Sequence, residues 1–330
     1  MSEVIKRYAG NPILSAADVP FPSSLVFNAG VCKFQGKYVM VFRNDVGFSP
    51  EGIKEKNYTN LGVAFSSDGI HWDVRDTPWD LPGKILNANP EYQRFYDPRL
   101  TVIDGRCYLC FAVDTYNGVR GGIAVTDDFE NFEVLSVSAP DNRNMVLFPE
   151  KVNGNFYRLE RPFPIYSTGG EFFDIWGAAS PDCRYWGEHK LVLSCKQVPY
   201  AGEKIGPGAP PVKTPAGWLT LFHAVKIHKD KTLNGWEQAD RPDFRWRKEY
   251  FAGIMLLDSD DPSKVIAMSK EPLIQAEAPC ETDGFRGSVI FPGGMILEDS
   301  GEVKIYYGAA DTVECLATAD VGDLIRFCGK

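Results

Sequence analysis

The sequence predicts an all-β fold, a five-bladed β-propeller, as one domain over residues 1–330. First, a two-strand pattern repeats five times along the chain. Second, no segment has the apolar spacing of an amphipathic helix of three turns or more, which argues against a doubly wound α/β fold. Third, 31 Gly, 23 Pro and an aromatic content of 13% favour many short strands joined by tight turns.

Each repeat begins with an apolar strand, a turn that contains Gly, and a second strand rich in aromatic and β-branched residues. A Gly-containing turn between two such strands is typical of a β-hairpin. The five predicted hairpins span residues 31–43, 100–113, 150–161, 210–225 and 294–311.

A third strand follows every hairpin, at residues 61–69, 121–129, 175–183, 252–262 and 315–323. Three of these strands lead into Asp-centred turns closed by an aromatic residue, "SSDGIHW", "TDDFENF" and "SPDCRYW", which resemble the turns between outer strands of propeller blades. Short fourth strands at 73–76, 133–136 and 190–194 complete a blade. A pair of β-sandwiches is the alternative, but five similar units do not divide naturally into two.

The formal net charge of -9 disfavours binding to nucleic acid or to an anionic membrane, so an anionic ligand needs a local basic pocket. The N-terminal stretch "MSEVIKRYAGNPIL" lacks the apolar core of a signal peptide, and no apolar run approaches a membrane span. The eight cysteines form no pair of CxxC motifs. We therefore expect reduced thiols in a cytoplasmic protein rather than disulfides or a metal site.

Polar residues flank the predicted hairpins at the edge where the inner strands of a propeller converge on one mouth. Each residue alone fits a turn, an ion pair or a core position. Their recurrence at equivalent hairpin ends instead predicts one functional site. The set comprises Asn28, Arg43, Asp45, Asp97, Arg99, Asp114, Arg143, Arg161, Lys204, His223 and Asp311.

Two kinds of chemistry are present in this set. Carboxylates beside Asn and aromatic residues suit sugar hydroxyls and acid catalysis of glycosidic cleavage. Arginine offers bidentate geometry to an oxyanion and lysine a point charge, which suits phosphate. The residues of this second kind, the basic quartet, are Arg143, Arg161, Lys204 and His223.

The motifs "FNAGV", "FRND", "YDPRL", "NRNMVLFP", "LERP", "KIGPGAPP", "LFHAV" and "YYGAAD", in this order, resemble glycoside hydrolase family 130. That family comprises β-mannoside phosphorylases and related mannosidases on a five-bladed propeller. The resemblance runs from about residue 11 to residue 323, nearly the whole chain.

Carried over residue by residue, the resemblance implies that Asp97 is the general acid, acting through the mannosyl 3-hydroxyl as a proton relay. It implies that the basic quartet binds phosphate. It also implies that Asn28, Arg43 and Asp311 correspond to family residues around the sugar ring. To this substrate-binding group we add Asp45, Tyr96, Arg99 and Asp114.

We therefore expect phosphorolysis of a β-mannoside with inversion, giving α-mannose 1-phosphate. Inorganic phosphate is the co-substrate, and no metal or organic cofactor is implied. An inverting hydrolase needs a second carboxylate to activate water, whereas phosphate is already anionic and needs cationic positioning. One alternative is a β-mannosidase that uses Glu150, Asp45 or Asp114 as base. Another is a non-catalytic propeller that binds glycans or a protein partner.

Two predicted loops have no clear family counterpart, residues 46–60 and 226–250, and both are expected to project near the mouth. The second contains Trp236, Phe244 and Trp246, which could stack on an acceptor sugar. A solvated loop or a contact in a homo-oligomer is the alternative. The leaving sugar stays open between glucose, mannose and N-acetylglucosamine.

Overall fold

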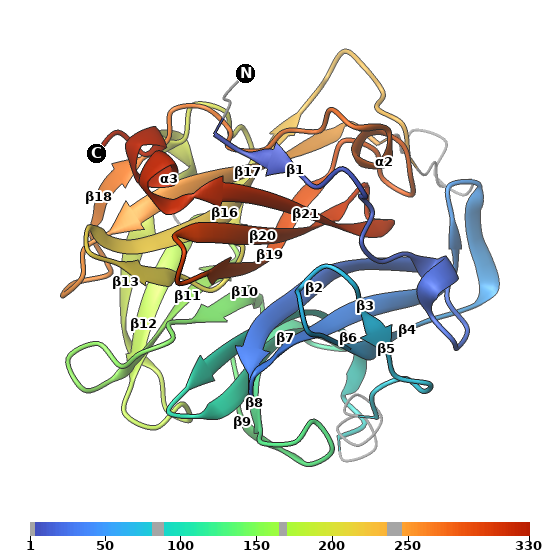
Figure 1. Cartoon of the computed structure of the whole chain (residues 1–330), viewed down its shortest axis with the longest axis horizontal. Coiled ribbons are helices and arrows are strands. Elements are labelled where there is room, and N and C mark those ends of the chain that lie inside the picture. The colour runs from blue at the N-terminus through green and yellow to red at the C-terminus, as the bar shows by residue number, and fades with distance from the viewer. Residues whose placement is uncertain (1–3, 81–88, 165–169, 236–245) are drawn as a thin grey trace.

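Five antiparallel sheets form the structure, a computed structural model that describes residues 4–80, 89–164, 170–235 and 246–330 (Figure 1). The five-bladed β-propeller predicted from the sequence is confirmed. Blade 1 contains β2 (Leu25–Phe34), β3 (Lys37–Ser49), β4 (Gly52–Ser66) and β5 (Asp73–Val74). Blade 2 contains β6 (Tyr92–Ile103), β7 (Arg106–Thr115), β8 (Gly118–Thr126) and β9 (Phe132–Val137).

The remaining blades follow in chain order. Blade 3 contains β10 (Asn142–Leu147), β11 (Phe156–Pro162), β12 (Ile175–Ser180) and β13 (Gly187–Leu193). In blade 4, β14 (Lys204–Pro207) and β15 (Val212–Thr214) both pair with β16 (Gly217–Ile227), followed by β17 (Lys248–Leu257) and β18 (Val265–Met268). Blade 5 contains β19 (Ile290–Leu297), β20 (Glu302–Ala309) and β21 (Val313–Asp320).

The N-terminal strand closes the ring. Strand β1 (Lys6–Arg7) pairs antiparallel with β21 as the outermost strand of blade 5, and the two lie side by side in Figure 1. The chain therefore joins its beginning to its last blade by main-chain hydrogen bonds, which ties blade 5 to blade 1. Because the ring is closed, each blade has a neighbouring blade on both of its faces.

Hydrophobic clusters fill the spaces between neighbouring blades. Between blades 5 and 1, for example, Tyr306 packs in one buried cluster with Met40 and Phe42. The Tyr306 hydroxyl also donates a 2.9 Å hydrogen bond to the carbonyl of Gly69. Similar clusters lie between each other pair of adjacent blades, so burial of apolar surface holds the ring together.

The Asp-centred turns predicted in three blades are present, and the structure adds two more. In each turn, one carboxylate oxygen accepts hydrogen bonds from the backbone N–H groups two and three residues further on. Such side-chain bonds satisfy the backbone donors of a tight turn. The five residues are Asp68, Asp128, Asp182, Asp258 and Asp320.

Two sequence expectations about strands are wrong. The third hairpin was expected at 150–161, but its first strand is β10, because the Gly turn lies within a longer connection rather than between the paired strands. Residues 46–60 are not a loop: β3 and β4 continue to pair there, as Phe48 with Ile53, in an arm at the right of Figure 1. Residues 226–227 and 248–250 likewise extend β16 and β17.

Within the part of the chain that the structure describes, helical structure is short. It consists of α2 (Pro279–Thr282), α3 (Val321–Phe327) and 3-10 turns at Ala16–Asp18 and Cys195–Gln197. Among the described residues, no helix has the length and apolar character needed to cross a membrane.

Candidate active site

Bulges interrupt the inner strands of three consecutive blades at the same level. The pairing register shifts at Asn28 in β2, at Asp97 in β6 and at Asn144 in β10. All three residues have left-handed backbone, with φ of 55°, 53° and 56°. Asn and Asp tolerate this conformation better than most residues, and a bulge re-aims a side chain beside a site. The sequence analysis expected Asn28 and Asp97 to precede the first strand of their hairpins. In the structure, Asn28 lies within β2 and Asp97 lies within β6.

A cavity of about 450 Å³ opens at these bulges and receives side chains from all five blades. It brings together most of the residues predicted for the site. Those that line it are Asn28, Arg43, Tyr96, Asp97, Arg143, Arg161, Lys204, His223 and Asp311.

Asp97 is surrounded by donors and cations. Its Oδ1 accepts a 3.0 Å hydrogen bond from Nδ2 of Asn28 and lies 3.6 Å from Nη1 of Arg43. Burial alone would raise the pKa of Asp97, but Arg43 and Arg99, with the Asn28 hydrogen bond, outweigh it and lower the pKa. The carboxyl group is therefore ionised in the free protein at neutral pH.

Arg43 is fixed from behind by Asp45. Its Nε and Nη2 donate to the two carboxylate oxygens of Asp45 at 2.9 and 2.6 Å, a bidentate pair. The Thr59 hydroxyl donates to the same carboxylate at 2.6 Å. Asp45 is fully buried and is not among the residues that line the cavity. It orients Arg43 from outside the cavity.

The basic quartet occupies one side of the cavity. Arg161 donates from Nη1 to Nε2 of His223 at 3.0 Å. Burial, and then repulsion by Arg143, lowers the pKa of Arg161 to about 9, while burial and Arg161 lower the pKa values of Lys204 and His223. The buried Nε of Arg143, Nε of Arg161 and Nδ1 of His223 have no hydrogen-bond partner among the described residues. Unpaired buried donors in a cationic cluster suit an oxyanion.

Arg99 lies beneath the cavity rather than in its lining. Its Nε donates to the carbonyl of Gly208 and its Nη1 to that of Pro98, both at 2.7 Å. The bond to Gly208 connects blade 2 to the segment between β14 and β15 of blade 4. The arginine predicted to bind substrate thus satisfies main-chain carbonyls around the central axis.

Asp114 also lies behind the lining. Its Oδ2 accepts from Nε of Arg94 at 3.0 Å, and its Oδ1 accepts from the Tyr96 hydroxyl at 2.8 Å. Glu150, named with Asp45 and Asp114 as a hydrolytic base, forms an exposed ion pair with Lys213. None of these three carboxylates lines the cavity.

Several lining residues were missed by the sequence analysis. Tyr250 stacks on His223 with ring centroids 6.2 Å apart, and Lys204 Nζ lies 5.3 Å from its centroid. Arg286 donates from Nη1 to Oδ2 of Asp311 at 3.1 Å. Arg286 lies in the stretch "GFRG" shortly before β19, the first strand of the fifth blade, and this position is a usable sequence signal. Tyr250 lies near the start of β17, far from any motif. Further missed residues are Phe48, Ile53, Arg94, Asn144, Lys248, Phe285, Val289 and Phe291.

Trp246, predicted as a stacking platform, does line the cavity, but it is nearly buried and donates from Nε1 to the carbonyl of Gly287 at 2.9 Å. Its ring stacks on Tyr250, with centroids 6.1 Å apart. Trp236 and Phe244 lie outside the described residues.

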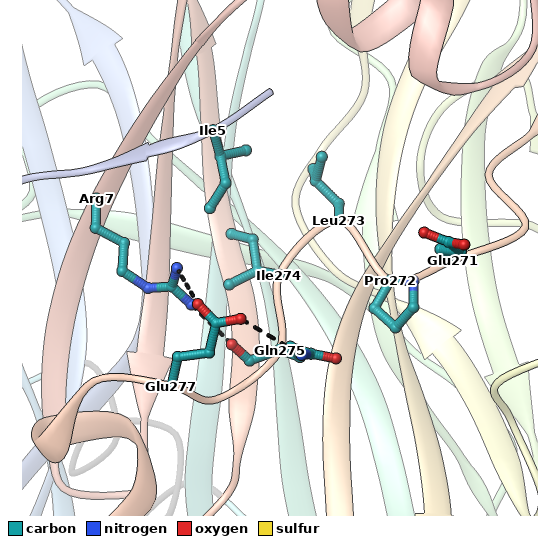
Figure 2. A pocket seen from close by; sticks show the side chains of 8 residues that line it. All are labelled: Ile5, Arg7, Glu271, Pro272, Leu273, Ile274, Gln275 and Glu277. Carbon is teal, nitrogen blue, oxygen red and sulfur yellow. Dashed lines mark hydrogen bonds and ion pairs between the residues drawn. The ribbon is translucent and has the colours of Figure 1, made fainter. Parts of the chain in front are cut away.

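A second hollow, of about 250 Å³, lies between β1 and residues 271–277 (Figure 2). Ile5, Leu273 and Ile274 provide apolar lining, and Arg7 turns toward Glu277, 3.2 Å away. Because Arg7 is paired with Glu277, the lining of this hollow has no group of cations comparable with the basic quartet. Within the described ranges, no group of three or more His, Cys, Asp or Glu residues is arranged to hold a metal ion.

Comparisons with known proteins agree with this architecture. A family model described as β-1,4-mannooligosaccharide phosphorylase matches residues 5–330. A β-1,4-mannooligosaccharide phosphorylase of Ruminococcus albus is 32% identical, covering 98% of this chain and 91% of its own. A β-1,2-mannobiose phosphorylase of Listeria innocua is 30% identical, covering 93% and 94%.

A solved structure of the β-1,2-mannobiose phosphorylase from Listeria innocua, in complex with β-1,2-mannobiose, superposes with a TM-score of 0.79 at 26% identity. The superposition covers 98% of this chain and 99% of that one. The family model and the relatives extend over nearly the whole chain, as the motifs did. The chain belongs to glycoside hydrolase family 130.

Proposed function

We propose that this protein is an inverting β-mannoside phosphorylase, which transfers a mannosyl group to inorganic phosphate and releases α-mannose 1-phosphate and a shortened acceptor. The observation that carries the proposal is the basic quartet in one cavity with Asp97. Burial and mutual repulsion lower the pKa values of Arg161, Lys204 and His223, and a bound anion would favour their charged forms.

In the proposed reaction, Asp97 supplies the proton that the leaving oxygen needs, by way of the mannosyl 3-hydroxyl as the family resemblance implies. Phosphate held by Arg143 and Arg161 attacks the anomeric carbon from the opposite face. The glycosidic C–O bond breaks, the phosphate C–O bond forms, and the configuration inverts. The chain contributes proton transfer, orientation and charge stabilisation.

Among the lining residues, Asp311 is the second carboxylate, and it accepts a hydrogen bond from Arg286. A hydrolytic mechanism would need such a group to activate water. Burial raises the pKa of Asp311 against the effect of Arg286. Hydrolysis of the β-mannoside, with Asp311 as the base that activates water, is therefore the competing reaction. The test has to measure it beside phosphorolysis.

The test incubates the protein with β-1,4- and β-1,2-linked mannobiose, with and without inorganic phosphate, and separates the products by anion-exchange chromatography. We expect mannose 1-phosphate only with phosphate, and little free mannose without it. Equal release of free mannose in both reactions would overturn the proposal in favour of a mannosidase. No turnover of any β-mannoside would favour a binding propeller. Run in reverse with glucose, mannose and N-acetylglucosamine, the assay identifies the acceptor.

We further propose that the whole chain acts as one catalytic domain in the cytoplasm, with phosphate as co-substrate and no metal or organic cofactor. All eight cysteines are free thiols in the structure, which supports a reducing compartment. Whether copies assemble into a homo-oligomer is decided by light scattering on the purified protein.

A further inference from the structure

Two arginines of the basic quartet face one another across a strand pair. Arg143 of β10 and Arg161 of β11 are directly paired in the register. Arg161 is buried and Arg143 is half-buried, and burial together with Arg143 lowers the pKa of Arg161. Two like charges on paired strand positions repel, so each guanidinium needs a partner that holds its orientation before phosphate arrives.

The partner of Arg143 is the Tyr96 hydroxyl. Nη1 of Arg143 donates to this oxygen at 3.1 Å, and the hydroxyl donates its own proton to Oδ1 of Asp114 at 2.8 Å. Because the hydroxyl proton points to Asp114, a lone pair of the oxygen faces Arg143. The Tyr96 side chain is only 3% exposed, so it has little freedom to turn away.

The Tyr96 ring is itself fixed by two cations outside the quartet. The guanidinium carbon of Arg94 lies 4.8 Å from the ring centroid and that of Arg43 lies 5.3 Å from it. Arg94 also forms the ion pair with Asp114, at 2.8 Å from Nη2 to Oδ2. The negative charge of Asp114 is thus matched by Arg94 and reaches Arg143 only through a neutral hydroxyl.

A neutral acceptor has a consequence for anion binding. A carboxylate in direct contact with Arg143 would cancel the charge that phosphate needs. The hydroxyl orients the guanidinium and leaves its charge available. Arg161 is held in the same way, since its Nη1 donates to Nε2 of His223, whose lowered pKa makes it a neutral imidazole.

We propose that Tyr96, held by Asp114, positions Arg143 for phosphate. Tyr96 and Asp114 are then positioning residues rather than sugar-binding residues. The inference rests on the proposed phosphorylase function, because it assigns the two residues to the phosphate half of the reaction.

The test is Tyr96→Phe, which keeps the ring and removes the acceptor of Arg143. Initial rates are measured with phosphate varied at saturating β-mannoside, and with β-mannoside varied at saturating phosphate. We expect KM for phosphate to rise about tenfold or more, as for a lost hydrogen bond to a charged group, with KM for the mannoside unchanged. Asp114→Asn retains an acceptor oxygen, so it should raise KM for phosphate less than Asp114→Ala.

The matched control is Tyr108→Phe, in the same blade but buried in the cluster between blades 2 and 3, away from the cavity. It should leave both KM values unchanged. If Tyr96→Phe leaves KM for phosphate unaltered, or raises KM for the mannoside equally, the positioning role is wrong. Calorimetric titration of phosphate into wild type and Tyr96→Phe, without sugar, tests the same relation even if the wild type proves to be a hydrolase.

Discussion

Asn28 donates a 3.0 Å hydrogen bond from Nδ2 to Oδ1 of Asp97, and both residues sit in left-handed backbone at bulges of neighbouring inner strands. The contact joins residues 69 positions apart, so it exists only because blades 1 and 2 are adjacent in the ring. The two bulges turn side chains that would otherwise alternate between core faces into the cavity. The proposed acid and its donor are therefore positioned by the same distortion.

Asp97→Asn tests the proposed general acid. The amide keeps the size of the side chain but has no acidic proton, so kcat for phosphorolysis should fall by about 10²–10⁴-fold or more. Thermal unfolding should remain close to that of the wild type. Asp104→Asn, at the exposed turn of the same hairpin, is the control and should leave kcat unchanged. Full activity of Asp97→Asn would remove this residue from the mechanism.

Phosphate binding should bring a proton to Asp97. The pKa of Asp97 is low in the free protein because cationic neighbours outweigh burial. An anion bound at Arg143 offsets those cations, so the pKa of Asp97 rises and phosphate binds more tightly as pH falls. Calorimetric titrations at neutral pH, in two buffers of different ionisation enthalpy, measure the proton uptake. We expect the Asp97→Asn variant to take up fewer protons than the wild type. Equal uptake in both proteins would place the proton on phosphate, Lys204 or His223 rather than on Asp97.

The sequence was sufficient to predict the ring, because hairpins, Gly turns and Asp-centred turns are local signals repeated five times. It also placed most of the cavity lining, since those residues stand in motifs. It could not distinguish lining from support: Asp45, Arg99 and Asp114 occupy comparable strand positions but point behind the cavity. Whether a side chain lines or supports the cavity depends on which face of its strand meets the next blade. The bulges at Asn28 and Asp97 change the direction of the side chains along these strands.

Gly206 is expected to be required for phosphate binding. A Cβ at this position would lie 2.5 Å from Cε1 of His223 and 3.0 Å from Cδ of Arg161, and both side chains are buried. Gly206→Ala should therefore displace the His223–Arg161 pair and raise KM for phosphate at least tenfold, as for the loss of a charge-assisted hydrogen bond. Gly202→Ala is the control, because its Cβ would meet only Cγ of Lys226 at 4.0 Å. Equal kinetics for both variants would contradict this role.

Glu314 should make the protein less stable as pH rises. It is fully buried next to the Asn28 bulge, where Oε2 accepts the backbone N–H of Ala29 at 3.1 Å. Burial raises the pKa of Glu314 to about 8, above its ordinary value of 4.5. Between these two values the folded chain keeps a proton that the unfolded chain loses, so the free energy of unfolding falls by roughly 1 kcal/mol per pH unit.

Glu314→Gln mimics the protonated carboxyl and lacks this dependence. Urea unfolding at pH values from about 5 to about 8 should show the wild type losing stability relative to the variant as pH rises. Glu302→Gln, at an exposed carboxylate on the neighbouring strand, should follow the wild type throughout. Parallel curves for wild type and Glu314→Gln would mean that the folded protein holds Glu314 ionised. The Asn28–Asp97 bulge would then adjoin a buried negative charge rather than a neutral acid.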